Sequence, residues 1–120
     1  MLIVLWILLA LLALFFVAAG ATKLVRSRSA LAASGMAWTD DYSAPIVKLI
    51  AAIEVVGAFG LVLPMLTGIA PVLTPIAAIG LAIVMVGAAV VHARRKESPV
   101  MQIVVAVLCV VAAILAFALI

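Results

Sequence analysis

Four long apolar segments, separated by shorter polar stretches, dominate the pattern of this chain. They cover residues 2–25, 45–63, 75–92 and 100–120. Each is close to the roughly 20 residues that a helix needs to cross a hydrocarbon core about 30 Å thick. The pattern therefore predicts an all-α integral membrane protein, in which a bundle of four transmembrane helices forms a single domain over residues 1–120.

The first apolar segment has a second interpretation as a signal peptide, because residues 17–20 (VAAG) resemble a cleavage site. Against this, no basic residue precedes the apolar run, the run is longer than usual for a signal peptide, and three further spans follow. We therefore expect a transmembrane helix that is retained.

The connections carry turn and interface signals. In the first loop, residues 29–36 predict a brief interfacial helix ended by Gly35, and Trp38 and Tyr42 are typical membrane-interface anchors. Asp40 and Asp41 precede the second span, so we expect them to favour the positive end of that helix or to remain solvated. A cation site on this pair is the alternative.

Prolines mark the second connection. Pro64 predicts the end of the second helix, because proline lacks the N–H that a helix interior requires. Thr74 and Pro75 predict a capping residue and first-turn residue for the third helix. The sequence thus predicts a short, rigid, uncharged turn over residues 64–75.

Composition supports the membrane assignment. Hydrophobic residues make up 72% of the chain and charged residues 9%, whereas a soluble domain is about a quarter charged. The net charge is +3, and all seven basic residues flank or lie in the first and third loops: Lys23, Arg26, Arg28, Lys48, Arg94, Arg95 and Lys96. Cytoplasmic loops are enriched in such residues, so we expect both termini on the non-cytoplasmic side of the cell (plasma or inner) membrane. The basic excess suits anionic lipid, and we expect no nucleic acid partner.

Glu54 is the residue that this architecture explains least easily. It lies about 14 Å along the helix axis from Pro45, near the centre of the bilayer. An ionisable residue there costs at least about 2.5 kcal/mol, and such residues face the bundle interior or a cavity. Its helical face carries the small residues Ala51, Gly57 and Ala58, which would admit a neighbouring helix or a ligand.

The candidate partners of Glu54 come from other segments. Lys48 lies about 120° around the same helix, so we expect it to reach the headgroups instead. Lys23 and His92 close the first and third spans at the same end of the bundle, and Met85 shares a helical face with His92. Lys23 could equally extend to the interface, and His92 could stabilise the end of its helix.

Metal and redox chemistry have weaker support. His92 and Met85 are seven residues apart on one helix, so they cannot bind opposite sides of one haem, although two copies of the chain could share a haem through His92. A zinc site would have only one His and one Cys. Cys109 is expected to be a small buried hydrophobe, because the chain offers it no second thiol.

Several of these features together resemble the DoxX-like family of small four-helix membrane proteins. They are residues 20–23 (GATK), a Trp-containing loop, residues 54–57 (EVVG) with Gly60, a Pro-rich turn, and Met85, Ala88 and His92. The resemblance implies a link to quinone or stress chemistry, because relatives include the membrane subunit of a thiosulfate:quinone oxidoreductase and mycobacterial proteins linked to oxidative and thiol stress. More distant relatives act in membrane-protein assembly or export. The chain has no paired cysteines or soluble redox domain, which argues against independent oxidoreductase activity.

The leading hypothesis is an intramembrane polar pocket that opens to the cytoplasmic side and binds an amphipathic ligand, a quinone or a lipid-like molecule. Its candidate residues are Lys23, Lys48, Glu54, Met85 and His92. Quinone is the candidate cofactor, and the protein would work with a redox or stress-response partner. The alternatives are an accessory or assembly subunit that docks on a membrane protein or on another copy of itself, and a small transporter.

Overall fold

The computed structural model describes residues 1–33 and 35–120, without the side chains of Arg28, Asp40 and Asp41. The expectations for the two aspartates, and that for Ser34 in the predicted loop helix, therefore lie outside the described residues. Within the described chain every regular element is helical, and four helices are long and apolar enough to cross a membrane. They are α1 (Leu2–Val25), α3 (Ala44–Thr67), α4 (Leu73–Arg94) and α5 (Val100–Leu119). The all-α, four-span architecture is confirmed.

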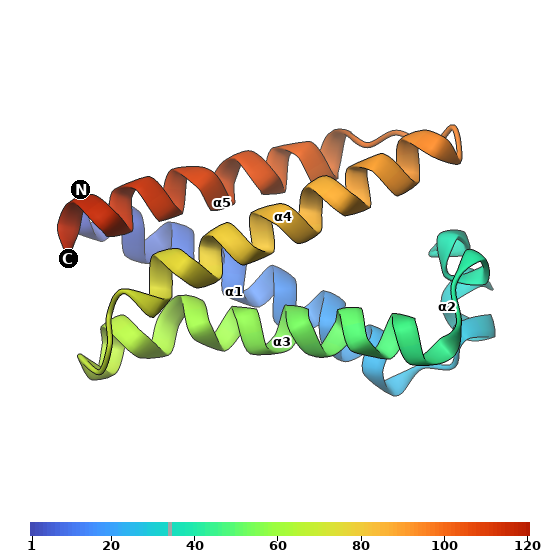
Figure 1. The fold of residues 1–120 in the computed structure, drawn as a ribbon, viewed down its shortest axis with the longest axis horizontal. Helices are drawn as coiled ribbons and strands as arrows, with labels where there is room; N and C mark the ends of the chain where they lie inside the picture. The colour runs from blue at the N-terminus through green and yellow to red at the C-terminus, as the bar shows by residue number, and fades with distance from the viewer. Residues whose placement is uncertain (34) are drawn as a thin grey trace.

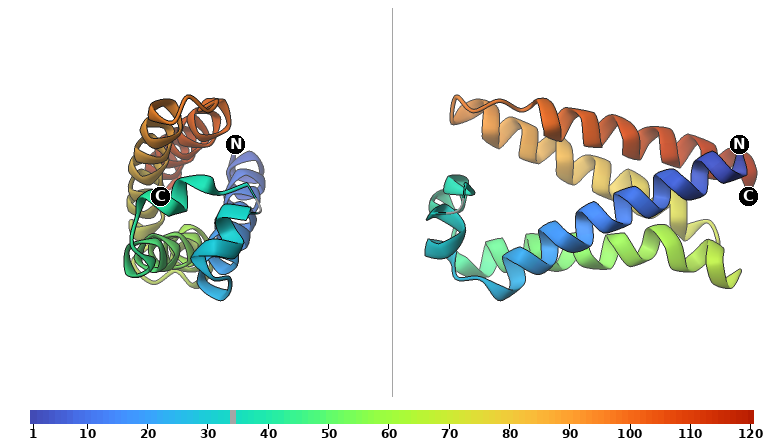
Figure 2. Two further views of the ribbon diagram at one scale, coloured as in Figure 1. Left: turned by 90° about the vertical axis from the view of Figure 1, so that its right-hand side faces the viewer. Right: turned by 180° about the vertical axis from the view of Figure 1, so that it is seen from behind.

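The helices form two pairs that meet at one end of the molecule. α1 packs mainly on α3, and α4 packs mainly on α5. Figure 1 shows the pairs close together where the termini and the α3–α4 turn lie, and spread apart at the opposite end. The first loop, with α2 (Arg28–Ala33) and the short 3₁₀ helix η1 (Ala37–Asp41), lies across that open end (Figure 2).

The apolar core fills the end at which the two pairs converge. Leu5, Leu9, Leu12 and Phe16 recur at helical spacing on α1 and are fully or almost fully buried. They belong to one cluster with small residues of α5, which include Cys109. Cys109 is buried, as expected for a small hydrophobe. Large apolar side chains cover the outer faces of all four helices, as a lipid environment requires.

The second helix does not end at Pro64, contrary to the prediction from the sequence. α3 continues to Thr67, and Gly68 ends it in a left-handed conformation (φ 72°). Proline removes a single backbone hydrogen bond, which a membrane helix tolerates, whereas a left-handed glycine redirects the chain. The connection between α3 and α4 is therefore shorter than the predicted 64–75 turn.

The third helix begins earlier than predicted. Its N-cap is Val72, so Thr74 is not the capping residue, and Thr74 and Pro75 both lie in the first turn of α4. Proline fits there because first-turn N–H groups have no partner within the helix. In the first loop the predicted short helix is present as α2, Gly35 follows it with φ 103°, and Ser43 caps α3 by accepting a hydrogen bond from the Ile46 N–H.

Lys48 caps the end of a neighbouring helix. Its Nζ donates to the backbone oxygens of Lys23, Leu24 and Arg26, at 2.5, 2.9 and 2.6 Å. The last carbonyls of a helix lack partners within the helix and lie at its negative end, so a cation is favourable there. Lys48 thus ties the end of α1 to the start of α3.

Gly20 lets α1 and α3 approach closely. A Cβ atom at this position would lie 2.6 Å from Val55 Cγ2 and 2.8 Å from the Ala51 backbone oxygen. The Ala51 oxygen is a backbone atom, so it cannot move aside as the end of a flexible side chain can. The contact lies about one turn from Lys23 and so controls how far the Lys23 side chain is from α3.

Replacing Gly20 by alanine should therefore destabilise the protein by about 1–3 kcal/mol, the usual cost of overpacking. The matched control is Gly80→Ala on α4, where an added Cβ meets nothing within 4 Å. The control should be neutral or slightly stabilising, because alanine is the better helix former. Unfolding in mixed micelles measures both, and equal effects would contradict the close approach.

Candidate functional site

A buried ion pair joins α1 and α3. Glu54 lies near the middle of α3 with 1% of its surface exposed, and Lys23 in the last turn of α1 is 7% exposed. Lys23 Nζ donates a hydrogen bond to Glu54 Oε1. Of the two partners that the sequence offered Glu54, the structure therefore selects Lys23. The Trp38 ring lies 5.6 Å from the same ammonium, in the range of a cation–π contact.

A cavity of about 530 Å³ lies beside this pair, at the end where the helix pairs spread apart. Residues of all four long helices and of the first loop line it, so it is a feature of the whole bundle. Its polar lining residues are Lys23, Trp38, Tyr42, Glu54, His92 and Gln102, and the remaining lining is mainly apolar, with Phe15, Val84, Met85 and Met101 among it. The cavity thus combines a polar wall with an apolar one.

The cavity brings together four of the five candidate residues. Lys23, Glu54, Met85 and His92 line it, whereas Lys48 does not. The cap that Lys48 forms on α1 accounts for this, because its ammonium is occupied by backbone oxygens. Lys48 therefore holds the end of α1, the helix that carries Lys23.

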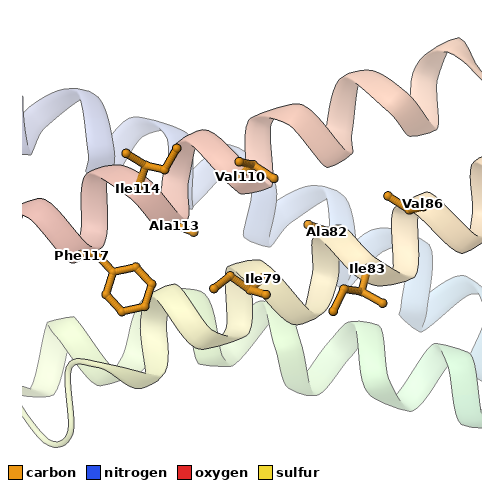
Figure 3. Close-up of a pocket in the computed structure, with 8 residues that line it drawn as sticks. All are labelled: Ile79, Ala82, Ile83, Val86, Val110, Ala113, Ile114 and Phe117. Carbon is orange, nitrogen blue, oxygen red and sulfur yellow. The ribbon is translucent and has the colours of Figure 1, made fainter.

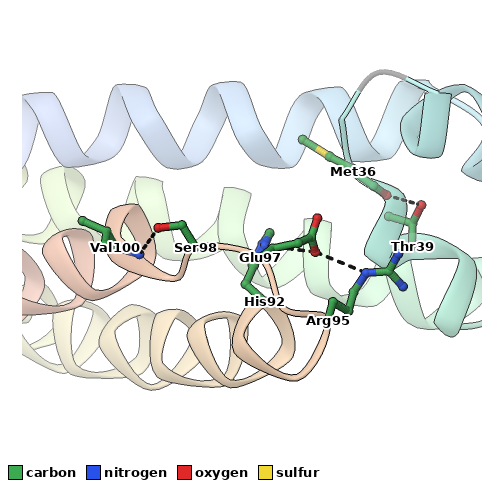
Figure 4. A network of polar contacts seen from close by, with 7 residues as sticks. All are labelled: Met36, Thr39, His92, Arg95, Glu97, Ser98 and Val100. Carbon is green, nitrogen blue, oxygen red and sulfur yellow. Dashed lines mark hydrogen bonds and ion pairs between the residues drawn. The ribbon is translucent and has the colours of Figure 1, made fainter.

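His92 is held by the tight turn between α4 and α5. Its Nδ1 lies 3.6 Å from Glu97 Oε1, and Arg95 Nε donates to the same oxygen at 3.2 Å (Figure 4). The turn itself is closed by a hydrogen bond from the Glu97 N–H to the His92 oxygen, and Lys96 adopts a positive φ of 60°. The His92 side chain therefore lies beside Glu97 while it contributes to the cavity wall.

Three polar residues of the cavity wall are not predicted as site residues from the sequence: Trp38, Tyr42 and Gln102. Gln102 is the polar residue of an otherwise apolar span, which is the signal that could have identified it. The sequence identifies Trp38 and Tyr42 only as interface anchors. The place of Trp38 over Lys23 depends on the fold of the first loop, in which the Thr39 hydroxyl donates to the Met36 oxygen.

Two side-chain oxygens of residues that line the cavity have no hydrogen-bond partner in the described part of the chain. Glu54 Oε2 and Gln102 Oε1 are buried and accept no hydrogen bond from any residue that the structure describes. A buried acceptor without a donor is costly, so such groups are normally satisfied by protein, water or a ligand. Both residues line the same cavity, which makes it the natural place for the missing donors.

A second hollow has a different character. An apolar groove of about 470 Å³ lies between α4 and α5, and only hydrocarbon side chains line it, with Ile79, Ile83 and Phe117 among them (Figure 3). It offers no group for acid, base or hydrogen-bond chemistry. Over the described part of the chain, no three His, Cys, Asp or Glu residues are grouped as a metal would require.

The Lys23–Glu54 pair gives a double-mutant test. Lys23→Met should cost about 3–5 kcal/mol of unfolding free energy, because it leaves a buried carboxylate without its partner. Adding Glu54→Met to Lys23→Met should recover most of that loss, since no buried charge remains. Unfolding in mixed micelles measures the coupling. Lys48→Met with Glu54→Met is the control and should be additive; an additive Lys23–Glu54 combination would contradict the pairing.

Comparison with known proteins identifies the protein family to which the chain belongs. Searches of curated proteins and of solved structures gave no match to this chain. The family model described as the DoxX-like family matches residues 7–115, a range that includes α3, α4, most of α1 and α5, and every residue of the polar cavity wall. The chain is therefore a multi-pass membrane protein of the DoxX-like family.

Proposed function

We propose that the protein binds an amphipathic molecule, a quinone or a lipid-like ligand, in the cavity beside Lys23 and Glu54. The head group lies against the polar wall, and the tail lies among the apolar residues. The observation that carries the proposal is that Glu54, whose buried Oε2 accepts no hydrogen bond from any described residue, lines a cavity formed by all four long helices. Small-molecule binding sites typically have this architecture: a mainly apolar cavity of about 300–1,000 Å³ with a few polar groups at defined positions.

The polar wall provides both donors and acceptors. Lys23 and His92 can donate to a ligand oxygen, and Glu54 can accept a hydrogen bond or exchange a proton. These groups bind and orient a head group, and they would also serve proton transfer to a quinone. Lys48 supports the site by holding the end of α1.

The proposed orientation places the cavity near the cytoplasmic surface of the cell membrane. The first and third loops lie at the spread end of the bundle and carry the basic residues. The positive-inside rule then supports cytoplasmic loops and both termini outside. A ligand head would thus lie at the level of the cytoplasmic headgroups, within reach of a redox or stress-response partner.

The second candidate function is an accessory or assembly subunit. The apolar groove between α4 and α5 favours it, because such a surface fits a helix of a partner protein or of a second copy. On this account Lys23 and Glu54 serve only to set the register of α1 against α3, a role attested for some buried polar groups. The two functions differ in whether the cavity is occupied.

Filling the cavity tests the first function. The protein purified in mild detergent should retain an amphipathic molecule, which native mass spectrometry detects. Ala88→Phe should abolish this retention, because Ala88 lines the cavity and the larger ring would occupy it. Val90→Phe is the matched control on the same helix, since Val90 is 44% exposed on the outside. An empty wild-type cavity, or equal retention by both variants, would overturn the proposal.

A further inference from the structure

We infer that the head group bound in this cavity is uncharged and donates hydrogen bonds through hydroxyl groups, as the head of a mono- or diacylglycerol does. This inference rests on the proposed function and narrows its ligand class. It follows from two properties of the polar wall. Its charged side chains already have partners within the protein, and the groups that still lack a hydrogen-bond partner in the described structure are oxygens, which accept hydrogen bonds.

The charge balance argues against an anionic head group. The Lys23 ammonium faces Glu54, and the Lys48 ammonium is surrounded by three backbone oxygens. His92 lies next to Glu97. A phosphate would therefore meet no unpaired cation among the residues lining the cavity, and it would lie beside a buried carboxylate. Like charges in a poorly hydrated site repel strongly.

The hydrogen-bond balance argues for donors. Glu54 Oε2 and Gln102 Oε1 are the two buried oxygens of the cavity wall that lack a partner in the described structure. An ionised carboxylate can only accept, so its free oxygen requires a donor. If the Gln102 amide is flipped, its NH₂ group takes the place of Oε1, but Glu54 Oε2 still requires a hydrogen-bond donor.

Hydroxyl groups meet both conditions. A hydroxyl is uncharged, donates one hydrogen bond and can also accept one from Lys23 or His92. A quinone carbonyl only accepts, so it leaves Glu54 Oε2 unpartnered. The hydroquinone form of a long-tailed quinone also carries hydroxyl donors, as a glyceride does. The binding experiment below distinguishes these two ligands.

The experiment compares probes that differ in one property. The protein in detergent micelles is mixed with dioleoylglycerol, its methyl ether, dioleoylphosphatidate, and a long-tailed benzoquinone with its hydroquinone. Native mass spectrometry then measures how much of each probe the protein retains. Dioleoylglycerol should bind about tenfold or more tightly than the methyl ether, because a hydrogen bond to a charged group is lost. The hydroquinone arm shows whether a quinol shares the site.

Two variants test which residues determine the preference for an uncharged head group. Glu54→Gln should shift the preference towards phosphatidate, because Lys23 loses its counter-charge. Gln102→Leu keeps that charge pair and should weaken dioleoylglycerol binding without a gain for phosphatidate. Thr67→Ala, at the far end of α3, is the control and should change neither preference.

The outcomes separate the two proposals. Hydroxyl probes that outcompete the methyl ether and phosphatidate support the inference. If the methyl ether, the benzoquinone or phosphatidate binds as well as dioleoylglycerol, the cavity binds amphipathic ligands but the inference is wrong. If no probe binds, the proposed function and the inference both fail.

Discussion

A charged residue buried inside a membrane protein constrains everything around it, and here that residue is Glu54. Its carboxylate lies within an apolar span and is neutralised by Lys23 from another helix. The pair forms only if the end of α1 is held against α3. Gly20 permits the close approach, and Lys48 of α3 holds the α1 terminus through its backbone oxygens. Three features of the α1–α3 contact therefore depend on one another.

The same arrangement accounts for the cavity. The two helix pairs are joined by a dense apolar core at the end where the termini lie, and they separate towards the first loop. Lys23 and Glu54 from one pair, and His92 and Gln102 from the other, then face a common space. The core provides stability, whereas the separated end has room for a ligand. The proposed binding site thus lies at the end where the helix pairs separate, away from the apolar core, as is common for functional regions.

Much of this organisation could be predicted from the sequence. Length and hydropathy predict the four spans, and the cost of burying Glu54 predicts that it faces inward with Lys23 or His92 as partner. The end of α3 and the role of Lys48 could not be predicted in this way. Pro64 is a weaker stop than Gly68, and the acceptors of Lys48 are backbone atoms of another helix, which leave no residue-type signal. Gln102 and Trp38 join the site only through the packing of α5 and the first loop.

The most direct measurement is solid-state NMR of the protein in lipid bilayers, with ¹⁵N-labelled lysine and ¹³C-labelled glutamate. The lysines are Lys23, Lys48 and Lys96, and the glutamates are Glu54 and Glu97, so few signals overlap. We expect a strong dipolar contact between Lys23 Nζ and the Glu54 carboxyl carbon, lost in Lys23→Met and retained in Lys48→Met. A wild-type spectrum without that contact, or one in which it survives Lys23→Met, would contradict the account.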